Sequence, residues 1–294
     1  MRQTDKFRSE TYTSDSMSNK SSKIQSVTDI HGIQPWFVMT ANDFLMHVAH
    51  ENPMLSHFYS FKGGQANQVT FAIPDGCVDV IFDCDSLQPN ALVIGTTLEA
   101  SEADFLHHHR YFGIRFIPGV VPEFFGLTAA ELIDKKYNLL DLLPHAKDTF
   151  EQVVSSNNFL QQIDLMNTFL KKFRVQKTSR LSMQVLAKIF QHNGNVRIKD
   201  LEAYTGYSIR TLQRQFRQDT GLTPKSFSRV VRCQSAVYEI NHREELAFSG
   251  LAFELGFSDQ PHFLREFKKL VSTTPLKYQQ SLKQSNYANR IKYY

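Results

Sequence analysis

The C-terminal part of the sequence contains two copies of one helical unit. Each copy reads as a helix, a short turn of glycine, an aromatic residue and serine, a second helix, and a Thr-Pro pair that opens the next element. Such a repeat restricts the region to an all-helical domain made of two related units. The copies align at four pairs of positions that lie 50 or 51 residues apart: Gly206 and Gly256, Arg214 and Arg265, Phe216 and Phe267, and Pro224 and Pro275.

The second helix of each copy, here called a recognition helix, has an apolar side and a basic side. Leu212 and Phe216 in the first copy, and Phe263 and Phe267 in the second, are each one helical turn apart and are expected to face a core. Two helices joined by a glycine-containing turn, with a basic second helix, form the helix-turn-helix that enters the DNA major groove. The predicted outward-facing residues are Arg210, Gln213, Arg214 and Arg217, and then His262, Arg265 and Lys268.

A single helix is predicted between the two units, from Pro224 to Asn241, because proline opens it and no glycine or proline interrupts it. A helix of this length spans roughly 27 Å at about 1.5 Å per residue. One turn of DNA is about 34 Å long. The sequence therefore predicts two recognition helices that enter successive major grooves, and a long, bipartite, asymmetric site.

The charge is distributed unevenly along the chain. The formal net charge is +4, but residues 1–177 hold 15 Lys and Arg against 20 Asp and Glu, whereas residues 178–294 hold 18 against 9. A solvated helix face is the ordinary explanation of basic side chains. Their repetition at fixed spacing in a strongly basic half instead favours an acidic partner, either nucleic acid or an anionic surface.

The two motifs also carry a family resemblance. "LAFELGFSDQPHFLREFKKLVSTTPLKYQQ" is similar to the signature of the AraC/XylS family of bacterial transcription regulators, and "LEAYTGYSIRTLQRQFRQDTGLTPKSFSRVVRCQSA" resembles its first helix-turn-helix. The resemblance covers about residues 180–280 and implies a domain that binds double-stranded promoter DNA and regulates transcription. RNA polymerase, a small-molecule effector and a second copy of the chain stay open as further partners. The DNA contacts it implies are Arg210, Gln213 and Arg214, with Gln260, His262 and Arg265.

Several further residues of the two units carry predictions of their own. Lys269 lies one turn beyond Arg265 and is expected to face backbone phosphates. Glu202 stands where the family usually has a small alanine, which predicts looser packing of the first helix on the second. Ser272 stands where a helix-ending glycine is usual, so an easy left-handed cap is missing. Either Ser258 or Asp259 is expected to cap the second recognition helix.

The N-terminal part predicts a different architecture. Alternating apolar segments and turns between Trp36 and Leu143 indicate a β-barrel or sandwich, with a hairpin at VTFAI-PDG-CVDVIF and further strands at ALVIG and FLHHHRYFGIRFI. "IPDGCVDVIF" and "GIRFIPG" resemble an uncharacterised sensor-like domain. Over residues 149–177 apolar residues recur at helical spacing, which predicts one amphipathic helix. This helix packs either on the sheet of its own chain or on a second subunit. The expected fold is α+β, with these parts: a disordered tail (1–27), a β-rich sensor-like domain (28–148), a helical linker or dimerisation helix (149–177), an AraC-type DNA-binding domain (178–281) and a polar tail (282–294).

Two groups in the N-terminal part are candidate sites. His107 and His109 would share one face of a strand and could hold a metal, which leaves a metal-dependent β-barrel enzyme fused to a DNA-binding module as the alternative function. Ordinary surface histidines are the competing explanation. Asp79 and Arg115 lie in strongly apolar strands, where they would form a buried ion pair or contact an effector.

Other classes of protein are disfavoured by the sequence. Cys77, Cys84 and Cys233 are too scattered for a disulfide framework or a zinc site and are expected to be buried thiols. The opening residues lack the apolar core of a secretory signal, and no apolar run is long enough for a membrane span, so a cytoplasmic location is expected. No catalytic or cofactor-binding motif with supporting context occurs. The predicted protein is not an enzyme and needs no cofactor.

Overall fold

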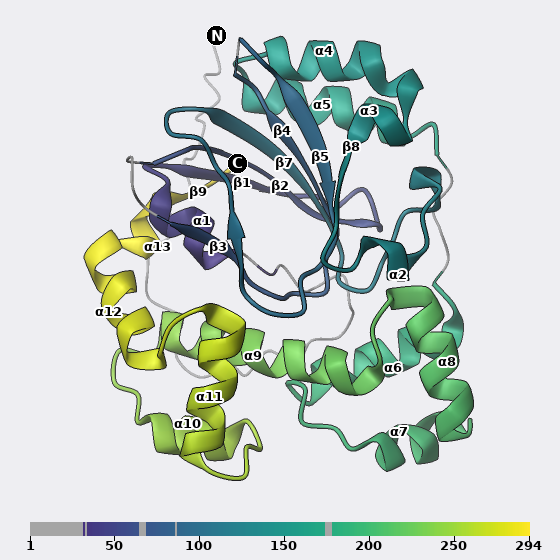
Figure 1. The fold of residues 1–294 in the computed structure, drawn as a ribbon, viewed down its shortest axis with the longest axis vertical. Coiled ribbons are helices and arrows are strands. Elements are labelled where there is room, and N and C mark those ends of the chain that lie inside the picture. Colours follow the sequence, from purple (N-terminus) through teal and green to yellow (C-terminus); the bar gives the residue numbers. More distant parts are fainter. Residues whose placement is uncertain (1–31, 33, 65–68, 86, 174–177) are drawn as a thin grey trace, which may run out of the picture.

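The computed structural model describes residues 32, 34–64, 69–85, 87–173 and 178–294. Within them, a β-rich N-terminal domain lies against an all-helical C-terminal domain (Figure 1), which confirms the expected α+β arrangement. The predicted tail 1–27 lies outside the described residues. Among the helices described, none combines the length and the apolar character needed to cross a membrane.

The N-terminal domain is built on a seven-stranded sheet and a separate pair of strands. The strands are β1 (Phe44–Val48), β2 (Leu55–Lys62), β3 (Thr70–Ala72), β4 (Asp79–Asp83), β5 (Asn90–Ile94), β6 (Ser101–Ala103), β7 (Arg110–Phe116), β8 (Lys136–Asn138) and β9 (Ile291–Tyr293). The large sheet has the order β8-β5-β4-β7-β2-β1-β9, and β3 pairs with β6. All pairs are antiparallel except β1 with β9.

Helices complete this domain. They are α1 (Pro35–Thr40), the 3-10 turns η2 (Glu123–Phe125) and η3 (Pro144–Ala146), α2 (Ala129–Leu132), α3 (Leu139–Leu142), α4 (Lys147–Ser155) and α5 (Phe159–Leu170). Helices α4 and α5 cover one face of the sheet (Figure 1), and α1 packs on the other face. The single helix expected over 149–177 is two helices, because Ser156 takes an extended backbone and the Asn158 side chain caps α5. Both pack into the core of the protein's own sheet.

Two of the strand predictions in this domain are wrong. The expected hairpin does not form, since β3 pairs with β6 whereas β4 pairs with β5 and β7. Gly76, at φ 76°, turns the chain from the small sheet into the large one. The strand expected from Phe105 begins only at Arg110, because His108 takes the left-handed backbone conformation. The strand predicted at ALVIG is confirmed as β5.

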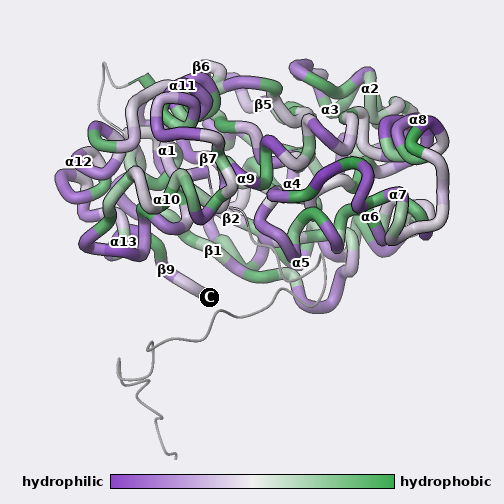
Figure 2. The backbone as a smooth tube through the Cα atoms, turned by 90° about the horizontal axis from the view of Figure 1, so that it is seen from below, coloured by the Kyte–Doolittle hydropathy of each residue, from purple (hydrophilic) through white to green (hydrophobic). Residues whose placement is uncertain are grey.

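The C-terminal domain consists of the two predicted units joined by a long helix. Its helices are α6 (Arg180–Gln191), α7 (Ile198–Thr205), α8 (Ile209–Thr220), α9 (Pro224–His242), α10 (Phe248–Glu254), α11 (Gln260–Val271), α12 (Pro275–Ser285) and α13 (Tyr287–Arg290). The recognition helices are α8 and α11. Viewed from below, they lie well apart, with α8 at the right end of the molecule and α11 in its left half (Figure 2). Thr223 and Thr274 cap α9 and α12, each just before the helix-opening proline.

The segment expected to be a polar tail (282–294) is instead part of the fold. It forms the end of α12, then α13 and β9, and β9 adds a parallel strand to the free edge of β1. The backbone N–H of Tyr294 donates to the carbonyl of Met46 at 2.9 Å, and Lys292 pairs with Asp43 at 2.7 Å. The end of the chain therefore returns to the N-terminal domain, because backbone groups at a sheet edge are available for pairing.

The two domains share hydrophobic cores. Met39 and Ile73 join the core of the second helical unit, while Ile117 and Val120 join that of the first. The indole N–H of Trp36 donates to the carbonyl of Val271 at 3.1 Å. Apolar side chains from both domains are thus buried together, which holds the domains in one arrangement.

The three cysteines are buried free thiols, as predicted. Burial raises the pKa of the Cys84 thiol to about 11 and that of the Cys233 thiol to about 12, and it also raises the pKa of Cys77. Thiols with raised pKa values stay protonated and react poorly.

Asp79 and Arg115 form the predicted ion pair, inside a larger buried network. The Arg115 guanidinium donates from Nε and Nη2 to the two Asp79 oxygens at 3.0 and 2.8 Å, and it pairs with Asp75 at 2.9 Å. Tyr59 donates to Asp79 at 3.1 Å. Burial raises the pKa of the Asp79 carboxyl, and Arg115 acts against that effect. The arginine is 2% exposed, and the two carboxylates balance its buried charge.

Replacing Arg115 by methionine is expected to lower the free energy of unfolding by about 3–5 kcal/mol, because two buried carboxylates lose their cation. Urea unfolding measures this change. Lys136→Met is the matched control, since it removes a cation from the exposed pair with Asp104; an exposed pair contributes about 1 kcal/mol or less. Equal small effects of the two substitutions would contradict a structural role for the network.

Candidate nucleic-acid interface

The first recognition helix presents the predicted residues to solvent. In α8, Leu212 and Phe216 are fully buried, as predicted, whereas Arg210, Gln213, Arg214 and Arg217 are exposed. The Ser208 hydroxyl caps the helix by accepting from the backbone N–H of Thr211. Gly206 ends α7 at φ 75°, a conformation that favours glycine. Local sequence thus fixes the turn, and the core fixes which side of α8 is free.

Glu202 does not loosen this unit as the sequence suggested. Its Oε1 accepts from the backbone N–H of Ile209 at 3.1 Å. That N–H opens α8 and has no partner within the helix. The carboxylate therefore links the two helices of the motif and satisfies a donor that an alanine would leave open.

The second recognition helix has the same organisation. Phe263 and Phe267 are buried in α11, while Gln260, Arg265, Lys268 and Lys269 are exposed, and His262 is half-buried. Of the two proposed caps, Asp259 is the one used: its Oδ1 accepts from the His262 N–H at 2.7 Å, which lowers the pKa of the carboxyl. Ser272 ends α11 at φ 68°, so a serine takes the left-handed position that usually holds glycine.

Both recognition helices touch the N-terminal domain at their C-terminal ends. At α11, Lys269 pairs with Glu99 at 2.6 Å, and its carbonyl accepts from the Ala100 N–H at 3.2 Å. At α8, Gly221 lies so close to α2 that an added Cβ would meet the Ala129 carbonyl oxygen at 2.6 Å. The contact at α8 extends toward the start of the helix, since Arg210, Gln213 and Arg214 line a pocket together with Thr128 and Ala130 of the N-terminal domain. Lys269, expected to face phosphates, is engaged with the other domain here.

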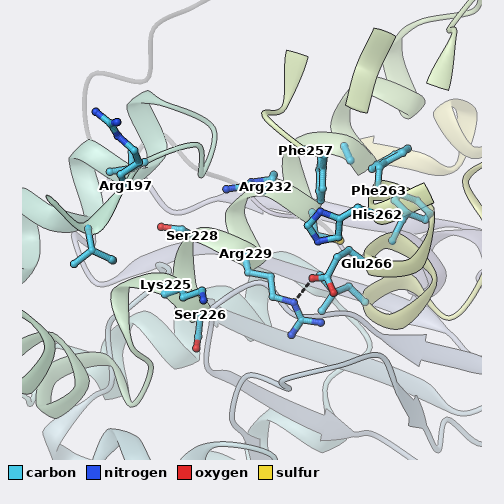
Figure 3. A pocket seen from close by; sticks show the side chains of 16 residues that line it. Arg197, Lys225, Ser226, Ser228, Arg229, Arg232, Phe257, His262, Phe263 and Glu266 are labelled. Carbon is cyan, nitrogen blue, oxygen red and sulfur yellow. Dashed lines mark hydrogen bonds and ion pairs between the residues drawn. The ribbon is translucent and has the colours of Figure 1, made fainter. Parts of the chain in front are cut away.

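A groove lies between the two helical units, here called the inter-unit groove, with a volume of about 530 Å³. Arg197 lies at one side of it, where α7 begins, and the second unit supplies Phe257, His262, Phe263 and Glu266. Arg229 of α9 forms an ion pair with Glu266 across the groove (Figure 3). The remaining polar residues that line it come from α9: Lys225, Ser226, Ser228 and Arg232.

Arg232 ties the two units together at this groove. It donates from Nη2 to the Gly194 carbonyl of the first unit at 3.1 Å and from Nη1 to the Gly256 carbonyl of the second at 3.4 Å. The guanidinium also lies 5.1 Å from the ring centre of Phe257. Burial lowers its pKa, but an arginine stays charged in proteins.

Residues 201–281 match a family model described as a helix-turn-helix domain. Residues 52–138 match a domain of unknown function (DUF6597). The transcriptional activator RhaS of Klebsiella pneumoniae (strain 342) is 35% identical over 77 residues, which are 26% of this chain and 27% of that protein. The chain thus spans about a quarter of the length of this curated relative. The C-terminal domain is thus similar to helix-turn-helix domains of transcription regulators, in agreement with the resemblance to the AraC/XylS family.

Two solved structures resemble the chain only loosely. A probable AraC family transcriptional regulator from Rhodopseudomonas palustris CGA009 is 25% identical, with a TM-score of 0.32, over 36% of this chain and 98% of that chain. ToxT from Vibrio cholerae O395 is 14% identical, with a TM-score of 0.38, over 82% of this chain and 96% of that chain.

The sequence missed Glu266 and the residues of α9 that line the inter-unit groove. Lys225 and Arg229 are four apart in α9, so a helical plot places them on one side, but their neighbours come from distant helices. Glu266 was likewise overlooked among the cations of α11. The i, i+4 spacing of Lys225 and Arg229 was the available signal that both lie on one side of α9. The sequence did not show whether that side is covered by the N-terminal domain or left open.

Of the two candidate sites of the N-terminal domain, the histidines are arranged differently from expectation, whereas Asp79 and Arg115 form the expected ion pair. His107 and His108 lie in a turn, while His109 Nδ1 is 2.9 Å from Asp83 Oδ2. No group of three His, Cys, Asp or Glu side chains in the described part of the chain is arranged to hold a metal. Asp79 and Arg115 are buried against each other, and neither lines the inter-unit groove.

Replacing Glu202 by alanine, the residue usual in the family, is expected to destabilise this protein by about 1 kcal/mol, because a helix-opening N–H loses its partner. Urea unfolding of the full chain is the measurement. Glu202→Gln keeps an acceptor oxygen at the same position and is expected to retain most of the stability. If alanine were neutral, or if glutamine were as destabilising as alanine, the hydrogen bond to Ile209 would not matter.

Proposed function

We propose that this protein is a sequence-specific DNA-binding transcription regulator that reads two successive major grooves of a promoter. The observation that carries the proposal is the pair of recognition helices whose buried sides are apolar and whose exposed sides carry arginine, glutamine and lysine. They are joined by the 19-residue helix α9, which spans about 28 Å at 1.5 Å per residue. This length is close to the roughly 34 Å between successive major grooves on one face of DNA.

The exposed side chains divide into two roles. Arginine and glutamine form bidentate hydrogen bonds with guanine and adenine, so Arg210, Gln213 and Arg214 suit base contacts from α8. Gln260, His262 and Arg265 suit the same role from the first two turns of α11. Arg217 and Lys268 lie further along their helices and suit phosphates, which add affinity without sequence information.

The N-terminal domain is positioned to regulate this binding. It contacts both recognition helices at their C-terminal ends, through Glu99 and Ala100 at α11 and through α2 at α8. A small-molecule effector or a second copy of the chain that moved these segments would also move the recognition helices relative to each other. We assign Lys269 to this contact between domains.

The alternative of a metal-dependent enzyme gains no support. His107 and His109 do not share a strand face, and the Asp79–Arg115 pair is saturated by its own hydrogen bonds. The proposed function also involves a target promoter, an effector and contact with RNA polymerase. Binding experiments with each of these partners test those parts of the proposal.

Arg265→Ala is expected to relax base preference at one position of the site, because a bidentate arginine–guanine contact contributes about 1–3 kcal/mol of discrimination. The site is first obtained by selecting duplexes from a random pool with the intact protein. Dissociation constants for every single-base variant of the selected duplex then give the base ranking.

Lys268→Ala is the matched control on the same helix. It is expected to weaken all variants alike and to lower the slope of log affinity against log salt by about one unit. Uniform weakening by Arg265→Ala, with an unchanged base ranking, would contradict the assignment of Arg265 to a base. Failure of the intact protein to enrich any sequence would contradict the proposed function itself.

A further inference from the structure

The inter-unit groove opens on the side of α9 that faces away from the N-terminal domain. Phe227 and Gln234 lie on the covered side, where Phe227 packs against Gly76 and Gln234 donates to the Pro74 carbonyl at 2.6 Å. Lys225, Arg229 and Arg232 follow at helical spacing on the opposite side. The groove is therefore not occupied by the protein's own sheet domain.

The groove continues from the proposed base-reading surface of α11. His262, one of the predicted DNA contacts, lines it together with Glu266 (Figure 3). Its other wall includes Arg197, directly before the first residue of α7. In helix-turn-helix proteins the first helix of the motif crosses the DNA backbone. Both walls thus belong to elements that approach DNA.

The charge of the groove fits a polyanion. Its lining includes four arginine and lysine side chains, Arg197, Lys225, Arg229 and Arg232, and a single carboxylate, that of Glu266. Glu266 pairs with Arg229, and both side chains are partly exposed. Lys225 has no ion-pair partner among the described residues. In the groove, an anion would therefore find one cation, Lys225, that has no ion-pair partner in the described part of the chain, and a second cation, Arg229, that is paired with a single carboxylate.

Unused hydrogen-bonding groups lie at the floor of the groove. Ser228 is 4% exposed, and its hydroxyl has no partner among the described residues; the same holds for Nε of Arg232. Buried polar atoms are normally hydrogen-bonded, so each such atom calls for an explanation. Phosphate oxygens, or water carried with them, are acceptors for both.

We propose that the inter-unit groove receives the sugar-phosphate backbone of the DNA segment between the two major grooves, with Lys225 and Arg229 as phosphate contacts. In the free protein Glu266 pairs with Arg229. When DNA binds, a phosphate takes the place of the Glu266 carboxylate. This inference rests on the proposed function and adds a third contact region to the two recognition helices. It commits to duplex DNA as the occupant, because the groove lies between two DNA-reading surfaces.

The test compares full-length variants on the selected duplex over a range of salt concentrations. Lys225→Gln is expected to weaken every single-base variant equally and to reduce the salt slope by about one unit, since one phosphate contact is lost. Glu266→Gln is expected to do the opposite and bind all variants several-fold more tightly, because Arg229 is released. Lys147→Gln on α4 and Glu123→Gln in η2 make the same charge changes far from the groove and are expected to change neither quantity.

A second arm locates the contact on the DNA. Neutral methylphosphonates are placed one at a time at the central phosphates of the selected duplex. The unmodified protein is expected to lose affinity when one or two of these phosphates are neutralised. The Lys225→Gln variant is expected to lose no further affinity at the phosphate that Lys225 contacts in the unmodified protein. Thermal unfolding of each variant establishes that the fold is retained.

Two results would overturn the proposal while leaving the proposed function intact. One is binding by Lys225→Gln and Glu266→Gln that equals that of the unmodified protein, with Arg265→Ala still changing base preference. The other result concerns the central phosphates. The proposal fails if the Lys225→Gln variant and the double variant Arg229→Gln, Glu266→Gln both lose as much affinity on methylphosphonate substitution there as the unmodified protein does. If no duplex is enriched by the intact protein, the proposed function fails first.

Discussion

The arrangement of the C-terminal domain depends on the burial of α9. This helix supplies Phe227 and Val231 to the core of the first unit, and it supplies Ala236, Val237 and Ile240 to the core of the second. Each fully buried aliphatic or aromatic side chain of this kind contributes about 1.5–3 kcal/mol relative to exposure. Because one rigid element is shared by both cores, neither recognition helix can rotate without disturbing packing that the other unit also needs.

This packing also determines where the basic side chains of the C-terminal domain lie. The core takes one side of α9 and of each recognition helix, so basic side chains remain on the sides that face solvent and the inter-unit groove. Arg232 is an exception, since it bridges carbonyls of both units and is half-buried. A basic side chain thus serves the fold at Arg232, whereas among the described residues Lys225 makes no ion pair and Arg229 makes one with Glu266, and only these contacts distinguish the positions.

The N-terminal domain adds a second constraint. It contacts the C-terminal ends of both recognition helices and is itself joined to the end of the chain through β9. An interdomain contact made at two separate points resists rotation more than a contact at one point. Glu99, α2 and the shared cores therefore link the position of the sheet domain to the positions of both recognition helices.

The sequence by itself determined the helical units, because their signals are local. Helix caps, glycines at left-handed positions and apolar residues one turn apart are sufficient to place α7 to α12 and to separate the buried Phe216 and Phe267 from the exposed Arg214 and Arg265. The buried pair of Asp79 and Arg115 was also predictable, since charges in apolar strands need partners. The pairing of β3 with β6, the return of residues 291–293 to β1 and the grouping of Lys225 with Glu266 were decided by tertiary structure. Each of these joins residues far apart in the chain, where strand pairing and side-chain contact depend on how whole elements pack and not on the spacing of neighbouring residues.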